Sequence, residues 1–423
     1  MPPPRLAPPR DLTIPEPGST TARDVLSRSI RRLLAELPQA GRGQAASLSP
    51  PARADLAAFQ RVVRGALASA PGAVASALRR PTAGALLRCL RPGRLPPGRA
   101  EPVLAELMAL LYLELAMEGA LPEPVEVRRP PARITSLLAQ AAVDVPEGVM
   151  ALAFENGSLA VRTPGGRRAV TLEGWAEGGA AAMDEDDCAG LRITRPYRPI
   201  DGGLVLALGD NNPVAMEEAH PDKGGNAIDL GGRAPDAWAD ALRTALDPIA
   251  RHLPDLRREM DLFLHQIVPV GFDAVRHLSA SYQEAIGTVY LSLHPSVMTL
   301  AEALIHEFSH NKINALFELD DVLENAFSPL YSSPVRPDPR PLHGVLLAVH
   351  AFLPVARLYE RMIEAGDPLA QGAAFSARFA EIRAINREGA EVLLRHGRPT
   401  PVGQGIMEEI ARWIERYSGG GLR

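Results

Sequence analysis

The chain has 423 residues, and 46% of them are hydrophobic. This is enough to form the hydrophobic cores of about two or three domains without disulfide bonds or structural metal ions. Its formal net charge is −5 and its basic residues are spread along the chain, so we expect no nucleic-acid partner. The two cysteines, Cys89 and Cys188, stand in unrelated sequence contexts, which excludes a disulfide framework and a cysteine-based zinc cluster.

The start of the chain is rich in proline and arginine. Residues 1–10 have no apolar stretch behind them that could form the core of a signal peptide. The most apolar predicted helix, at residues 104–117, contains Glu106 and Glu114, so it is not expected to span a bilayer. We therefore expect a cytoplasmic protein with no membrane partner.

The first two predicted regions are a Pro-rich arm at residues 1–20, which we expect to cross the surface in extended form, and a helical region at residues 21–145. Thr20 or Thr21 can cap the first helix, in which apolar residues recur with helical spacing at Val25, Ile30, Leu33 and Leu34. Further amphipathic helices are predicted at residues 53–68, 102–117 and 133–142.

The third region, residues 146–232, is predicted to be β-rich. Short apolar runs at 151–154 and 159–161 flank the turn Glu155-Asn156-Gly157, which is typical of a β-hairpin. Strands are also predicted at 169–172 and 204–208, and the acidic run at 184–187 is expected in a solvated loop.

The fourth region, residues 233–423, is predicted to be the catalytic domain. It is expected to hold helices at 237–249 and 256–267, strands at 268–270, 275–282 and 287–293, and a long helix that Ser296 caps and that ends near residue 319. A Pro-rich connection then precedes helices at 342–365, 373–396 and 404–417. The whole chain is therefore predicted to be an α+β protein, mostly helical with a small sheet.

The long helix carries the run His306-Glu307-Phe308-Ser309-His310. Residues four apart on a helix are offset by only about 40°, so both imidazoles project from one face and can share one ion. A strand directly before such a helix is the zincin arrangement. Since two histidines on a largely buried helix would otherwise need hydrogen-bond partners, we predict a divalent metal ion bound by His306 and His310.

A third ligand is required, and several residues can supply it. His343 is the favoured candidate, because it begins the next helix after a loop long enough to fold back. His350 is the second choice, and its alternative interpretation is a core histidine with satisfied hydrogen bonds. Carboxylates are the third option, at Glu318, Asp320, Asp321 and Glu324.

Two chemistries use such ligands, and the spacing leaves both open. In a zinc peptidase, Glu307 would be the general base that takes a proton from metal-bound water. In an iron(II) oxygenase, the remaining coordination positions would receive a 2-oxo acid and dioxygen.

Flanking residues suggest how a carboxylate ligand would be held. Lys312 is one of only two lysines in the chain, although its direction on the helix points away from the ion. Arg336 and Arg340 lie among prolines that pre-set the backbone, and an arginine fork suits the distal carboxylate of 2-oxoglutarate. Asn314 lies near the metal face and is a candidate hydrogen-bonding group around the ion.

The run from His306 to Lys312, followed by Ala315-Leu316 and by Arg340-Pro341-Leu342-His343-Gly344-Val345-Leu346, resembles a known bacterial group. These are the 2-oxoglutarate-dependent HExxH-type peptide β-hydroxylases, the HExxH-motif peptide-modification proteins of ribosomal peptide natural-product clusters. The likeness is clearest over residues 287–352, and the amino-terminal residues 12–19 are also similar.

The resemblance implies iron(II), the co-substrates 2-oxoglutarate and dioxygen, and a ribosomally synthesised precursor peptide hydroxylated at a β-carbon. It implies that His306, His310 and His343 bind the iron and that Glu307 orients the site rather than activating water. Two alternatives remain from the residues alone: a zinc metallopeptidase, and a non-catalytic peptide-binding protein with a vestigial metal helix.

Overall fold

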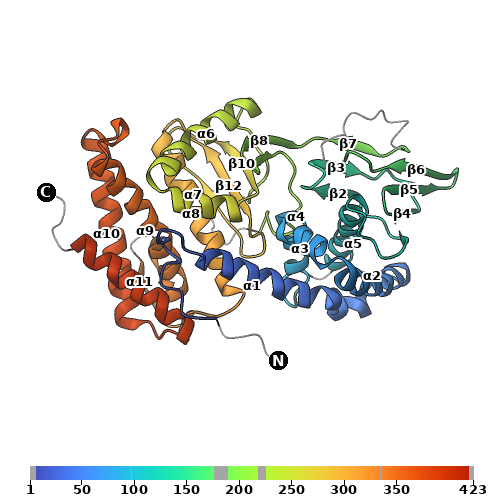
Figure 1. Cartoon of the computed structure of the whole chain (residues 1–423), viewed down its shortest axis with the longest axis horizontal. Coiled ribbons are helices and arrows are strands. Elements are labelled where there is room, and N and C mark those ends of the chain that lie inside the picture. The colour runs from blue at the N-terminus through green and yellow to red at the C-terminus, as the bar shows by residue number, and fades with distance from the viewer. Residues whose placement is uncertain (1–5, 97, 176–188, 218–224, 334–335, 419–423) are drawn as a thin grey trace.

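The computed structural model describes residues 6–96, 98–175, 189–217, 225–333 and 336–418. The molecule is elongated, with the helices and sheets of the amino-terminal half at one end and the carboxy-terminal helices at the other (Figure 1). The predicted α+β class is confirmed: helices dominate, and the strands form small open sheets. The acidic run at 184–187 lies outside the described residues.

The amino-terminal half begins with a helical layer. Its most apolar helix, α5, has every residue from Val103 to Ala116 buried except Glu106, so neighbouring elements surround it on all sides. Three of these helices were predicted, whereas the short α3 and α4 were not. The layer consists of α1 (Thr21–Glu36), α2 (Pro50–Ser69), α3 (Pro71–Arg79), α4 (Pro81–Cys89) and α5 (Ala100–Met117).

Two antiparallel sheets pack on this layer. One has the strand order β1-β4-β5-β6 and the other has the order β2-β3-β7. The predicted hairpin is confirmed, because Glu155 pairs with Ser158 across a two-residue turn in which Gly157 adopts φ +77°. The strands are β1 (Val125–Val127), β2 (Arg133–Ser136), β3 (Ala141–Asp144), β4 (Ala151–Glu155), β5 (Ser158–Thr163), β6 (Gly166–Thr171) and β7 (Arg192–Thr194).

The helix predicted at 133–142 is wrong, since this segment forms β2, a turn and the start of β3. Its apolar residues happen to recur with helical spacing. The β-branched Ile134 and Thr135 favour a strand, and Gln140 reverses the chain with φ +48°. Pairing between β2 and β3 therefore outweighs the local pattern.

The central sheet has the order β11-β12-β10-β9-β8, with β9, β10 and β12 parallel and the outer strands antiparallel to their neighbours. Of the predicted strand at 275–282 only Ser279–Ala280 forms, and it is one edge of this sheet. The elements here are β8 (Tyr197–Asp201), β9 (Leu204–Ala207), α6 (Pro235–His252), α7 (Pro254–Phe263), β10 (Gln266–Phe272), β11 (Ser279–Ala280) and β12 (Thr288–Leu293).

The carboxy-terminal helices pack around α8, the helix predicted to bind metal. Among the described helices only α9 is long and apolar enough to cross a membrane, and 72% of its most apolar stretch is buried inside the protein. The segment predicted as a Pro-rich connection contains a two-stranded sheet. The elements are α8 (Val297–Phe317), β13 (Leu330–Ser333), β14 (Arg336–Pro341), α9 (Leu342–Glu364), α10 (Ala373–His396) and α11 (Pro401–Ser418).

Two large hydrophobic clusters divide the chain differently from its sequence order. One joins the predicted helical and β-rich regions, from Leu33 to Leu191. The other joins the central sheet and carboxy-terminal helices to the arm and the first half of α1. Helix α1 therefore runs from one core to the other, as Figure 1 shows.

The described part of the amino-terminal arm, residues 6–20, lies only partly on the surface: residues 12–14 are buried, whereas Arg10 and Pro17 are exposed, which corrects the sequence-based expectation for that segment. Leu12 and Thr13 are fully buried, and the backbone N–H groups of Thr13 and Ile14 donate to the two carboxylate oxygens of Glu409 on α11, each at 2.9 Å. The arm is built into the core because these N–H groups find a buried acceptor there.

Candidate metal centre

Helix α8 is fixed at its start and along its length. The Ser296 hydroxyl accepts a hydrogen bond from the Thr299 N–H at 3.2 Å, which confirms the predicted cap. Further along, the Asn311 side chain accepts from the Gly287 N–H at 2.6 Å and donates to the Thr288 carbonyl at 3.2 Å. Because Gly287 and Thr288 lead into β12, Asn311 holds the helix in register with the central sheet.

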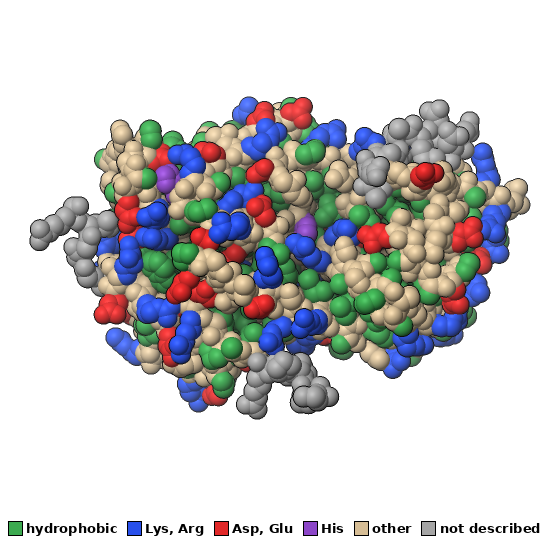
Figure 2. All heavy atoms as spheres, viewed as in Figure 1, with side chains coloured by type: hydrophobic (Ala, Val, Ile, Leu, Met, Phe, Trp, Pro, Cys, Tyr) green, Lys and Arg blue, Asp and Glu red, His purple; other side chains and the backbone are tan. Residues whose placement is uncertain are grey.

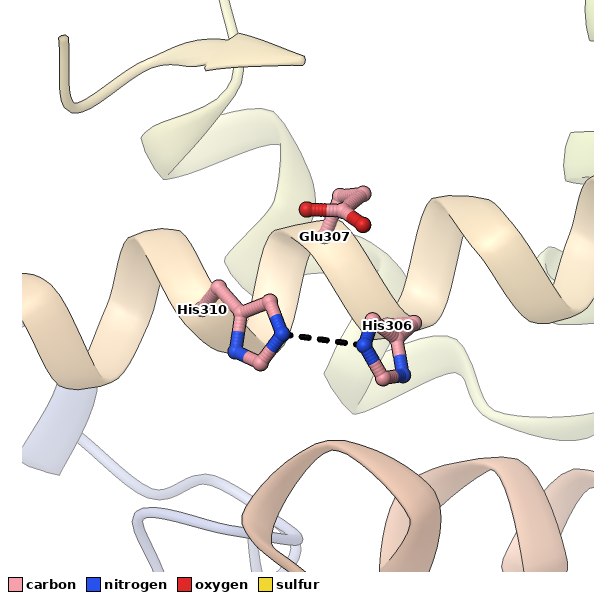
Figure 3. A group of neighbouring side chains, drawn as sticks. All are labelled: His306, Glu307 and His310. Atoms are coloured by element: carbon pink, nitrogen blue, oxygen red, sulfur yellow. Dashed lines mark hydrogen bonds between the residues drawn. The ribbon is translucent and has the colours of Figure 1, made fainter. Parts of the chain in front are cut away.

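His306 and His310 lie one turn apart on α8 with their rings side by side (Figure 3). Their Nε2 atoms are 2.9 Å apart, and the ring planes are nearly perpendicular at 85°. The Phe352 ring of α9 meets His306 edge-on, with 4.8 Å between the ring centroids. The two nitrogens therefore converge on one point in an aromatic surrounding.

Burial lowers the pKa of both imidazoles, and that of His306 falls well below its ordinary value. For His306 the neighbouring His310 is the second cause, followed by the positive charges of Arg378 and His277. For His310 the carboxylate of Glu307 opposes the effect of burial. Neutral imidazoles are the form that binds metal ions, so the site is prepared for a cation without having to release protons.

The distance between the rings fits a shared ion. Two lone pairs can face each other so closely only if a proton or a cation lies between them. Two nitrogens that are each about 2.0–2.1 Å from one ion and about 90° apart are separated by about 2.9 Å. The observed separation of 2.9 Å equals that value.

Glu307 completes the group that can hold a metal ion. The ligand atoms of His306, Glu307 and His310 all lie within 4.8 Å of one another. The Ser279 hydroxyl of β11 donates to Glu307 Oε1 at 2.7 Å, while Glu307 Oε2 is buried and has no hydrogen-bond partner among the described residues. One carboxylate oxygen is thus held by the edge strand and the other is available to the site.

The favoured third ligand, His343, lies outside this group of three. Its ring is sandwiched between Phe317 and Phe327, with centroid distances of 4.6 and 5.1 Å. His310 contributes to lowering its pKa after burial does, so the two imidazoles are close enough to interact electrostatically. His343 therefore stays a predicted ligand, packed between two aromatic rings and outside the group of three.

The other third-ligand candidates have partners of their own. His350 is fully buried, and its Nδ1 lies 3.0 Å from the Thr13 hydroxyl. Glu318 is paired with Arg91 at 2.6 Å, and Asp320 accepts hydrogen bonds from Thr400 and Val322. Asp321 and Glu324 are exposed.

The predicted carboxylate-binding residues are dispersed. Lys312 is completely buried and pairs with Glu259 on α7 at 2.7 Å. Arg340 pairs with Asp338 beside it in β14 at 3.0 Å. The side chain of Arg336 lies outside the part of the chain that the structure describes. Asn314 is buried on α8, and its place around the ion stays a prediction.

Sequence reasoning missed Ser279, Phe352 and the pair Glu302–Arg378. Helical spacing could have indicated Glu302, since it precedes His306 by four residues. No sequence signal points to the other three, because the fold alone brings β11, α9 and α10 to α8.

No protein-family model matches the chain, and no curated protein matches it. What stands on the geometry is therefore the class of site: a histidine and glutamate group on a buried helix, fit for one metal ion.

Proposed function

We propose that the chain is an iron(II)- and 2-oxoglutarate-dependent dioxygenase that hydroxylates a β-carbon in a ribosomally synthesised precursor peptide. The observation that carries the proposal is the convergence of two imidazole nitrogens, 2.9 Å apart, on one face of a buried helix. The resemblance around His306–Lys312 adds the peptide substrate, and we expect the reaction to take place in the cytoplasm.

Iron(II), when bound by His306 and His310, supplies the redox chemistry that couples 2-oxoglutarate and dioxygen to hydroxylation. The chain's own part is to hold and shield this centre. Phe352 limits the access of water to His306, and Glu307, held by Ser279, orients the site through its second oxygen. Asn311 fixes the helix that carries both histidines.

The setting suits an extended peptide. Strand β11 is an edge of the central sheet, and its Ser279 touches Glu307 directly. Edge strands offer unpaired backbone groups to which a peptide can add as a further strand. A peptide bound along β11 would lie beside Ser279, and Ser279 contacts Glu307 of the candidate metal centre.

The second candidate is a zinc peptidase that trims such a peptide, and Glu307 favours it. Its Oε2 atom is unpartnered among the described residues, and one of its carboxylate oxygens lies within 4.8 Å of a ring nitrogen of each imidazole, as a general base requires. The two functions differ in metal, co-substrate and product.

The test loads the full chain anaerobically with iron(II), adds 2-oxoglutarate and air, and measures succinate. A parallel sample loaded with zinc receives a casein digest and is assayed for new amino termini. Succinate release with iron supports the dioxygenase. Peptide cleavage by the zinc-loaded protein, with no succinate from the iron-loaded protein, overturns the dioxygenase in favour of the peptidase. If neither succinate nor new amino termini are formed, both enzyme functions are overturned and a non-catalytic peptide-binding protein is left.

A further inference from the structure

The metal-binding face of α8 continues beyond the two histidines. Glu302, His306 and His310 follow one another at four-residue intervals, so their side chains leave the helix on one side. One helical turn of four residues advances about 6 Å along the axis. Any group that Glu302 holds therefore stands about one turn from the imidazole of His306.

Glu302 holds an arginine. Its carboxylate accepts hydrogen bonds from Arg378 on α10, from Nε at 3.1 Å and from Nη2 at 2.7 Å. The Tyr359 hydroxyl of α9 donates to the same carboxylate, and the Tyr359 ring stacks on Phe379 at 5.8 Å. Two helices thus fix the position of the guanidinium group beside α8.

Arg378 keeps hydrogen-bonding capacity after these contacts. A guanidinium has five N–H groups, and the contacts with Glu302 and Glu381 use one each on Nε, Nη2 and Nη1. One N–H on each terminal nitrogen is left over among the described contacts. The Arg378 side chain is 36% exposed, so a ligand can reach it.

Two carboxylates of different exposure pair with Arg378. Glu381 is 60% exposed, so water screens its carboxylate, whereas Glu302 is only 13% exposed and serves as the fixed support.

We propose that Arg378 is the carboxylate anchor of this site and binds one end of a short dicarboxylate whose other end lies at His306 and His310. On the proposed function, on which this assignment rests for its ligand, the dicarboxylate is 2-oxoglutarate. Lys312 is completely buried against Glu259, whereas Arg378 is partly exposed and is held by Glu302, one turn before His306, so Arg378 takes the role that the sequence suggested for Lys312 and Arg340. Two charge-assisted hydrogen bonds of an arginine fork are the expected contact.

The experiment compares two ligands that differ only in the distal carboxylate. Protein loaded with zinc in place of iron is titrated calorimetrically with 2-oxoglutarate and with 2-oxopentanoate. The wild type should prefer 2-oxoglutarate by between about 10- and 100-fold, the worth of a charge-assisted contact. Arg378→Gln should bind both ligands equally and keep its metal content, and Arg378→Lys should recover part of the preference.

Arg340→Gln is the matched control and should leave the preference unchanged. The proposal is overturned if the wild type does not discriminate between the two ligands or if Arg378→Gln discriminates as well as the wild type. Binding and turnover separate the two claims. A preference for 2-oxoglutarate that depends on Arg378, together with no succinate from the iron-loaded protein, upholds the anchor and rejects the dioxygenase.

Discussion

Replacing Lys312 with methionine should strongly destabilise the protein. Lys312 is completely buried, and its ammonium group lies 2.7 Å from Glu259 Oε2, while Glu259 Oε1 has no partner among the described residues. The lysine is therefore the main compensation for a buried carboxylate. Removing one partner of a buried pair costs about 3–5 kcal/mol, so the free energy of unfolding of Lys312→Met should fall by that amount.

The double variant Lys312→Met, Glu259→Met separates the ion pair from packing. Two apolar side chains of similar volume remove both charges, and such replacements are often neutral or stabilising. Urea denaturation followed by circular dichroism should therefore show the double variant within about 1 kcal/mol of the wild type. A double variant whose loss equals the sum of the two single losses would refute the argument that the two charges compensate each other.

The cost of Lys312→Met should also depend on pH. Burial raises the pKa of Glu259 even with Lys312 present. Loss of the positive charge of Lys312 raises the pKa of Glu259 further. The folded variant then holds a proton that the unfolded chain releases above its ordinary pKa near 4.5. The stability of the variant should therefore fall as pH rises from 5 to 8, relative to the wild type. If the free energies of unfolding of variant and wild type differed by the same amount at pH 5 and at pH 8, this expectation would be contradicted.

Three further predictions concern the site and the core. His343→Ala should abolish iron retention, measured by elemental analysis, whereas full retention would point to His350 or a carboxylate as third ligand. Glu307→Gln should keep 2-oxoglutarate-dependent succinate release within about tenfold, since a general base would be worth 10²-fold or more; a larger loss would favour the peptidase. Burial raises the pKa of Glu106 to about 7, so the folded chain holds a proton between pH 4.5 and 7 and loses stability across that window. Glu106→Gln should flatten this slope in thermal denaturation, a change of about 3 kcal/mol across the window, and an unchanged slope would argue against it.

The parts of the fold that the sequence predicts well are those with strong local signals. Ser296 and the apolar period behind it define α8, and the Asn156-Gly157 turn defines the hairpin. Both depend on interactions within a few residues. The same local reasoning located His306 and His310 on one face of a helix, because helical geometry alone determines it.

Prediction from the sequence fails where contacts between distant segments determine the structure. Pairing with β3 makes a strand of residues that have helical spacing, and the buried acceptor Glu409 draws Thr13 of the arm into the core. Arg378 is separated from His306 by most of two helices and a small sheet, and no periodicity connects them. The proposed anchor Arg378 therefore could not be predicted from the residues that neighbour the motif in sequence.

The metal content of the protein tests the account most directly. Wild-type chain loaded anaerobically with iron(II), freed of excess metal and analysed by mass spectrometry for iron, should retain a single ion per chain. His306→Ala and His310→Ala should retain none while keeping the wild-type circular dichroism spectrum. Iron that stays bound in both variants, or a wild type that retains no metal, would contradict the claim that these two imidazoles form a metal centre.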